Sequence, residues 1–254
     1  MLKNTLVLVF TYALFFTSSY THAQITEADF RLVTQAFHDE YDSELKSRNQ
    51  AISINPASSP AMIGFWWKLD EVRAAYSSLF DKDTKILTHY LFLLGGYARM
   101  SGMTRDGVAA TLCHELGHGI GGGPYKNYEF EDTDVSVEGQ ADYFAFRYCL
   151  ARIFKRLPPT GPVKPLSDYT DSLCKNRPVT SYAFCTRAFQ TLESERTFFK
   201  LNPDDPNSSY DQHDPTTVTS VEKDPYFYPS TQCRLDTMMN GILEKERPRC
   251  WYAP

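Results

Sequence analysis

Two histidines, His114 and His118, flank a glutamate, Glu115, in the segment His-Glu-Leu-Gly-His. On an α-helix of about 3.6 residues per turn, positions i and i+4 share one face, so both imidazoles project together. Two neutral imidazole nitrogens one turn apart can bind a single Zn²⁺ at about 2.0–2.1 Å. Glu115 is turned about 100° away from His114, which suits a base beside the metal better than a third ligand. The spacing therefore predicts a zinc site in which Glu115 accepts a proton from the water that the metal activates.

A pair of carboxylates downstream strengthens this interpretation. The pentapeptide alone also occurs on ordinary solvated helices. Glu138, however, follows His118 by 20 residues, and Asp142 follows Glu138 by one helical turn. Glu138 supplies a third ligand and leaves the fourth coordination position open, as a catalytic zinc site requires. Asp142 would support the ligands, or would instead form a surface ion pair with Arg147 or Arg152.

The two motifs together resemble those of the gluzincin metallopeptidases. The segment Glu-Gly-Gln-Ala-Asp-Tyr-Phe-Ala, residues 138–145, is similar to the Glu-x-x-Ala-Asp-x-x-Ala helix of CAAX-prenyl-protease-type peptidases and of the compact minigluzincins. The resemblance covers about residues 61–150. It implies an α+β, zincin-like fold, in which a small mixed or antiparallel sheet has an edge strand over the active-site helix and a second helix carries the third ligand. It also implies that Asp142 accepts the free N–H of a zinc-ligating histidine.

A weaker resemblance lies near the C-terminal end. Tyr228-Pro229 followed by Arg234 is similar to the His-Pro-x-x-x-x-Arg-Ile segment of the prenyl-protease-type peptidases, with tyrosine in place of histidine. It implies that Arg234 lies near the active site and that Tyr228 helps to bind the oxyanion. His213 is a second candidate by loose analogy with a late histidine of thermolysin, but a solvated loop histidine is the preferred interpretation.

The first 23 residues have the pattern of an export signal. Lys3 gives a short positive region, an apolar stretch follows over residues 6–16, and Thr21-His22-Ala23 is a usable cleavage site. A membrane anchor is the alternative, but the apolar stretch is too short to span about 30 Å of hydrocarbon. We therefore expect a secreted protein, periplasmic or extracellular, with no integral membrane anchor. The membrane-embedded relatives differ from this chain in that respect.

The six cysteines all lie in the second half of the chain. An even number in an oxidising compartment favours up to three disulfides, for which 15 connectivities exist. Cys174 with Cys185 and Cys233 with Cys250 are close in the sequence and are the first pairings to consider. Cys113 and Cys149 would then pair with each other if the two predicted ligand helices pack together. Buried free thiols are the alternative.

Length and charge limit the function classes. A chain of 254 residues can bury one substantial core with a small appended part, and four prolines within residues 157–165 mark a boundary. We expect a catalytic domain at 24–156 and a disulfide-containing helical and loop part at 157–254. A net charge of −5 gives no reason to expect nucleic acid as a partner. Protein or peptide substrates are expected instead.

Hydrophobic periodicity predicts the elements around the motifs. Helices are expected over residues 26–48, 104–118, 136–154 and 181–201, with Thr26 and Thr104 as N-caps. Strands are expected over 61–68 and 84–98, and over 72–78, where helical spacing fits as well. Loops are expected over 53–60, 119–133 and 202–229.

The strand at 84–98 has a functional interpretation. By resemblance, the strand before the metal helix edges the cleft and a peptide substrate adds to it through main-chain hydrogen bonds. An interior strand without a ligand is the alternative. Gly95-Gly96 would let this strand bend or a peptide approach closely. His89, on the same strand, is interpreted as a histidine satisfied within the fold.

The sequence as a whole predicts a secreted, zinc-dependent metalloendopeptidase with one Zn²⁺ per chain. A non-peptidase zinc amidohydrolase, acting on small or cell-wall amides, is one alternative. A catalytically inactive binding or inhibitory protein on a metallopeptidase scaffold is another. The sequence does not indicate side-chain specificity, zymogen control or oligomeric state.

Overall fold

The computed structural model of the protein describes residues 25–56, 64–127, 133–176, 181–202 and 207–253. The predicted export signal lies outside these residues. The elements in chain order are α1 (Glu27–Ser47), β1 (Gln50–Ile54), α2 (Phe65–Lys68), β2 (Ala74–Phe80), β3 (Leu87–Leu93), α3 (Gly95–Ala98), α4 (Arg105–Ile120), α5 (Glu138–Phe144), a π-helical turn (Ala145–Cys149), α6 (Leu150–Ile153), α7 (Asp168–Lys175), α8 (Tyr182–Phe199) and α9 (Thr231–Ile242). The fold is therefore α+β, as the sequence predicts.

The sheet is mixed and has three strands in the order β1-β3-β2. β1 pairs with β3 in parallel, and β2 pairs with β3 antiparallel, with Ala75 opposite Phe92. Strands were expected at 72–78 and 84–98, and β2 and β3 lie within or close to these ranges. β3 is shorter than expected because the chain turns into α3 at Gly95.

Two local predictions were wrong. Residues 65–68 form the one-turn helix α2 rather than a buried strand, and residues 61–63 lie outside the described part. The indole of Trp66 donates to the carbonyl of Pro56 at 2.9 Å and packs against Phe92. The aromatic run is therefore held by side-chain contacts rather than by strand pairing. Conversely, β1 occupies residues 50–54, part of which was expected to be loop.

The position of β3 in the sheet corrects the functional interpretation of the strand at 84–98. Because β1 pairs along one side of β3 and β2 along the other, β3 is the central strand. In the part of the chain that the structure describes, β2 has a neighbour on one side only. The strand that can accept a further strand beside the metal helix is therefore β2.

Gly95 and Gly96 permit a close approach, but the approaching group belongs to the chain itself. A Cβ atom at Gly95 would lie 1.8 Å from the carbonyl oxygen of Trp67, and one at Gly96 would lie 2.1 Å from that of Asp70. The amide of Gly96 donates to the carbonyl of Leu69 at 2.7 Å. These glycines therefore fix α3 against the segment that leads into β2.

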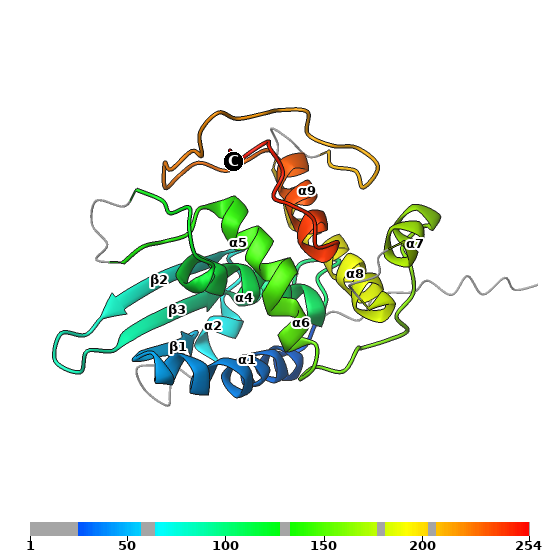
Figure 1. The fold of residues 1–254 in the computed structure, drawn as a ribbon. Helices are drawn as coiled ribbons and strands as arrows, with labels where there is room; N and C mark the ends of the chain where they lie inside the picture. The colour runs from blue at the N-terminus through cyan, green and yellow to red at the C-terminus, as the bar shows by residue number, and fades with distance from the viewer. Residues whose placement is uncertain (1–24, 57–63, 128–132, 177–180, 203–206, 254) are drawn as a thin grey trace, which may run out of the picture.

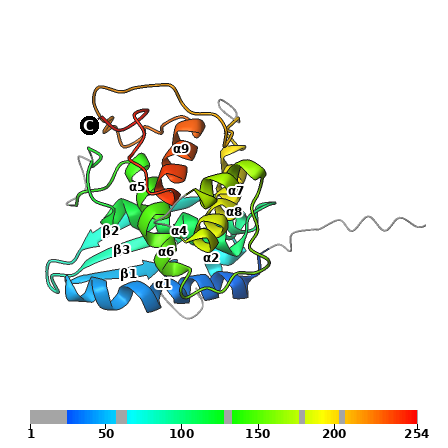
Figure 2. The same ribbon diagram turned by 45° about the vertical axis from the view of Figure 1, so that its right-hand side comes forward.

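The two long N-terminal helices begin as predicted. Thr26 and Asp29 form a capping box at the start of α1, and the Thr104 hydroxyl accepts from the amide of Gly107 at the start of α4. α1 packs along β1, whereas α4 packs over β2 and β3 and against α5 (Figures 1 and 2). The sheet and α5 thus enclose the helix that carries His114 and His118.

The C-terminal helices α7, α8 and α9 lie on the side of α4 and α5 away from the sheet (Figure 1). α8 packs on α4, and α9 packs on α5. The buried side chains Phe189, Leu192 and Leu235 from this part join the same hydrophobic cluster as Phe37 and Leu112. Residues 207–229 contain no helix or strand, as expected, and run over α5 and α9.

All six cysteines are paired in the connectivity that the sequence suggested first. The disulfides are Cys113–Cys149, Cys174–Cys185 and Cys233–Cys250. The first joins α4 to the π-helical turn that follows α5, so it ties together the helices that carry His114, His118 and Glu138. Of the helices in the described ranges, none combines the length and the apolarity needed to cross a membrane.

Candidate metal centre

The helix α4 places His114 and His118 on one face, one turn apart, with their ring centroids 4.7 Å from each other. The Nδ1 atom of His118 lies 2.8 Å from the carbonyl oxygen of Ser136. Because a carbonyl oxygen can only accept, this Nδ1 carries the proton and Nε2 is left with its lone pair. The Nδ1 atom of His114 lies 2.8 Å from Oδ1 of Asp142, an ion-pair contact behind the imidazole.

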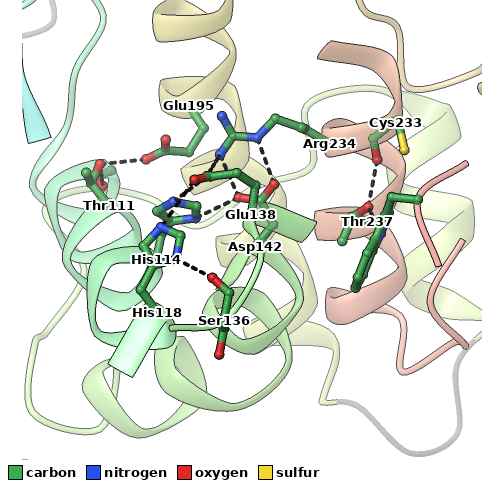
Figure 3. Close-up of polar contacts among 12 residues, drawn as sticks. Thr111, His114, His118, Ser136, Glu138, Asp142, Glu195, Cys233, Arg234 and Thr237 are labelled. Carbon is green, nitrogen blue, oxygen red and sulfur yellow. Dashed lines mark hydrogen bonds and ion pairs between the residues drawn. The ribbon is translucent and has the colours of Figure 1, made fainter. Parts of the chain in front are cut away.

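The two Nε2 atoms converge on the carboxylate of Glu138, the first residue of α5 (Figure 3). His114 Nε2 lies 3.2 Å from one oxygen of Glu138, and His118 Nε2 lies 3.5 Å from the other. Ligands of a tetrahedral zinc at about 2.0–2.1 Å are separated by about 3.3 Å. One ligand atom from each of the three residues lies within 4.8 Å of the others. The three side chains therefore form a group that can hold a metal ion, and their donor types suit zinc.

The position of Glu138 depends on tight packing between α5 and the C-terminal segment. A Cβ atom at Gly139 would lie 2.3 Å from the indole of Trp251, so only glycine fits beside the ligand. The indole in turn donates to the Thr237 hydroxyl of α9 at 2.8 Å. α5 is thus seated against α9 at the point where the third ligand projects.

Burial and mutual charge set the protonation of the three residues. Burial raises the pKa of Glu138, but His118 and His114 outweigh it and hold this pKa well below its usual value. Burial lowers the pKa of His118 to about 4. The pKa of His114 is lowered by burial but raised further by Asp142 and Glu138, to about 10. Glu138 and His118 are therefore ready to donate electron pairs at neutral pH, whereas a metal would have to replace a proton on His114.

Glu115 lines the same cavity as the three candidate ligands and is itself buried. Burial raises its pKa to about 7, against the lowering effect of His114. A carboxyl group with a pKa near the working pH can both accept and release a proton.

Asp142 and Arg234 form a buried ion pair behind His114. Two guanidinium nitrogens of Arg234 donate to the two oxygens of Asp142 at 2.8 Å each. Burial raises the pKa of Asp142, but Arg234 and His114 outweigh it and lower this pKa below its usual value. Asp142 thus contacts His114, as the resemblance implied, and not Arg147 or Arg152, which pair with glutamates elsewhere.

The candidate residues near the C-terminal end, Arg234, Tyr228 and His213, differ in their position relative to the cavity. Arg234 lines it, and its guanidinium lies 4.0 Å from the second oxygen of Glu138. Tyr228 also lines the cavity but is 59% exposed, and the Arg234 guanidinium lies 5.8 Å from the centre of its ring. His213 does not line the cavity; it is largely exposed and contacts Asp236 at 3.2 Å.

His89 is satisfied within the fold, as the sequence analysis preferred. Its Nδ1 atom lies 2.8 Å from the Tyr76 hydroxyl, and burial lowers its pKa to about 4. His89 does not line the cavity, although the ring of Tyr76 packs near His118.

Three charged residues that line the cavity, Arg73, Lys126 and Glu195, were not predicted. Lys126, in the segment between the ligand helices, places its ammonium 2.5 Å from an oxygen of Glu138. Glu195, on α8, reaches the cavity from the C-terminal part. No sequence motif marks any of the three residues.

The cavity itself has a volume of about 400 Å³. Residues 72–76, which lead into and begin β2, line one side, and Tyr97, Thr111 and Phe198 line another. Comparison of the chain with protein-family models, with curated proteins and with solved structures finds no match. The site is thus defined by its geometry: two histidines and a buried carboxylate grouped in the wall of a cavity, with a second carboxylate beside them.

Proposed function

We propose that the protein is an exported, zinc-dependent metalloendopeptidase in which His114, His118 and Glu138 bind one zinc ion and Glu115 is the base. The observation that carries the proposal is the convergence of both Nε2 atoms on Glu138 in the wall of a cavity that Glu115 also lines. Three protein ligands with space in front of them are typical of catalytic rather than structural zinc.

Each residue of the site has a distinct task in this proposal. Zinc bound there supplies a Lewis acid for the scissile carbonyl and acidifies water. Glu115 accepts the proton from the attacking water and delivers it to the leaving nitrogen. Asp142 holds His114 in the metal-binding tautomer, and Arg234 keeps Asp142 ionised. Tyr228 and Arg234 line the cavity and supply donors for the carbonyl oxygen as it gains negative charge.

The edge of the sheet supports an extended peptide as the substrate. β2 has one described neighbour, β3, and the residues around its start line the cavity beside His118. An extended chain can add to such an edge through main-chain hydrogen bonds, which read the backbone rather than the side chains. Export is supported by the three disulfides, because they persist in oxidising compartments.

The size of the cavity supports a second candidate, a zinc amidohydrolase that acts on small or cell-wall amides. A volume of about 400 Å³ lies within the range of small-molecule sites. Substrate length separates the two candidates. An endopeptidase cleaves unfolded proteins internally, whereas an amidohydrolase acts only on short amides.

The test uses zinc-loaded protein that lacks residues 1–23, an unfolded protein substrate and a set of short amides, with mass spectrometry of the products. We expect internal cleavage of the unfolded protein. We expect Glu115→Gln to abolish cleavage while zinc binding is retained, because the substitution removes the base and leaves the three ligands. Cleavage at the same rate by Glu115→Gln would remove Glu115 from its assigned role. Hydrolysis of the short amides alone would favour the amidohydrolase.

A further inference from the structure

Glu195 is a buried carboxylate that enters the cavity without a cationic partner. It is 6% exposed and comes from α8, on the opposite side of α4 from the sheet. One of its oxygens accepts from the Thr111 hydroxyl at 2.9 Å (Figure 3). The other lies 3.5 Å from the Tyr97 hydroxyl. Among the residues that the structure describes, no lysine, arginine or histidine nitrogen lies within ion-pair distance of it.

The cationic side chains that line the cavity lie beside other acids. Lys126 contacts Glu138, Arg234 contacts Asp142 in a two-fold ion pair, and the exposed Arg73 lies 3.8 Å from Glu71. Burial accordingly raises the pKa of Glu195 to about 7, although the Thr111 hydroxyl, His114 and Arg234 lower it. An ionised carboxylate in such a place is costly unless a positive charge accompanies it. A ligand that brings a positive charge would remove this cost.

The place of Glu195 relative to the metal centre limits which part of a substrate it can meet. Thr111 precedes His114 by three residues on α4, so Glu195 lies about one helical turn, or about 5 Å, from the first metal ligand along the helix. An extended peptide advances about 3.3 Å per residue. A peptide bond held at the metal centre would therefore place Glu195 within one or two residues of it along the substrate.

The walls beside Glu195 fit an aliphatic stem. Tyr97 and Phe198 line the cavity there, with their ring centroids 5.2 Å apart. The two rings pack on each other and form an aromatic surface beside Glu195, which suits a side chain that is apolar along its length and cationic at its end.

We propose that Glu195 forms a subsite for a cationic amine of a peptide substrate, next to the scissile bond. The proposal rests on the peptidase function proposed above and adds the substrate class to it. A lysine or arginine side chain and a free N-terminal ammonium share this chemistry. The competing explanation is a structural one, in which Glu195 only links α3 and α8 to α4 through Tyr97 and Thr111.

Glu195→Gln separates these explanations because its amide oxygen still accepts from Thr111 while its charge is lost. Glu193→Gln is the matched control. It removes a carboxylate from the same helix, but Glu193 is partly exposed, pairs with Arg196 and does not line the cavity. The substrates are peptides that are identical except for lysine or norleucine at each position flanking the cleaved bond. Each peptide is made with a free and with an acetylated N-terminus.

The first readout is kcat/KM of the zinc-loaded proteins. A charge-assisted contact contributes about 1.5–3 kcal/mol, so we expect the cationic peptide to be preferred about tenfold or more by the wild type and by Glu193→Gln. In Glu195→Gln the ratio should fall to about one. A preference for lysine in the acetylated series identifies the side chain as the cation, and a preference that disappears on acetylation identifies the N-terminus. An unchanged ratio in Glu195→Gln, or no preference in the wild type, would overturn the proposal.

The second readout is binding of the same peptides, fluorescently labelled, to zinc-loaded Glu115→Gln with and without Glu195→Gln. Cleavage without a preference for the cationic peptide would support the proposed peptidase function and refute the proposed subsite. Binding that prefers the cation in a Glu195-dependent way, without cleavage by the wild type, would keep the subsite and remove the peptidase. Absence of both cleavage and binding would overturn both.

Discussion

The uncompensated charge of Glu195 predicts that this residue destabilises the folded protein at neutral pH. Its pKa is about 7 in the folded chain and ordinarily 4.5. Because the folded state then binds more protons than the unfolded state between these values, stability falls as the pH rises through this window and stays low above it. A difference of one pKa unit corresponds to about 1.4 kcal/mol. Ionisation of Glu195 therefore lowers the free energy of unfolding by less than about 1 kcal/mol at pH 5 and by about 3 kcal/mol at pH 8.

Glu195→Gln removes this contribution, so the variant should gain stability over the wild type as the pH rises. The assay is urea unfolding with the disulfides intact, in the presence of a chelator, at intervals from pH 5 to pH 8. Other groups that titrate in this range, such as Glu115, are common to both proteins and largely cancel in the comparison. Glu193→Gln should show no gain that grows with pH. A difference between variant and wild type that stays flat across the range, or that shrinks toward pH 8, would refute the reasoning.

Three further predictions concern the support of the metal centre. Asp142→Asn should weaken zinc binding about 10–100-fold, because His114 loses the carboxylate that orients it, and competition with a chelating dye measures this. Arg234→Met should lower the free energy of unfolding by about 3–5 kcal/mol, because it leaves Asp142 buried without its partner; combining it with Asp142→Asn should recover part of the loss. Replacing Cys174 and Cys185 together by serine should cost about 3 kcal/mol, because that disulfide closes a short loop.

Each of these predictions has an outcome that contradicts it. Equal zinc affinity in Asp142→Asn would show that Asp142 does not orient His114. Additive losses in the Arg234 and Asp142 double variant would show that the two residues are not coupled. A cysteine double variant that unfolds at the wild-type urea concentration would show that the loop of α7 and α8 is ordered without its disulfide.

The sequence predicted the structure correctly where a single local signal determines it. Thr26 and Thr104 each precede an amphipathic run and cap α1 and α4 as predicted, because the side-chain oxygen satisfies an amide at the helix start. The i, i+4 spacing of His114 and His118 likewise fixes them on one helix face. The three disulfides followed from proximity along the chain and from the packing of the ligand helices.

Where the structure depends on pairing between distant segments, the sequence was misleading. β1 is five residues long and buries only Ile52, so it gives almost no periodic signal. The resemblance placed the strand at 84–98 at the edge of the cleft, with an interior strand as the alternative, whereas β1 pairs beside β3 and makes it central. The aromatic run at 61–68 fitted a strand, because a short apolar run does not distinguish a strand from one helical turn.

The candidate site divides in the same way. The residues of the two helical motifs could be predicted from the sequence: His114, Glu115, His118, Glu138 and Asp142. Lys126 and Glu195 could not be predicted, because their position at the cavity depends on how a loop and a distant helix pack against α4 and α5. No local pattern encodes that packing, and only the assembled fold shows that Glu195 has no counter-charge within ion-pair distance among the described residues.

Metal content is the most direct test of the central claim that His114, His118 and Glu138 bind zinc. The protein without residues 1–23 is reconstituted with zinc, desalted and measured by mass spectrometry, beside His118→Ala and the exposed-histidine control His213→Ala. We predict about one zinc per chain in the wild type and in His213→Ala, and loss of the metal in His118→Ala. Folded wild-type protein that retains no zinc, or His118→Ala that retains as much as the wild type, would contradict it.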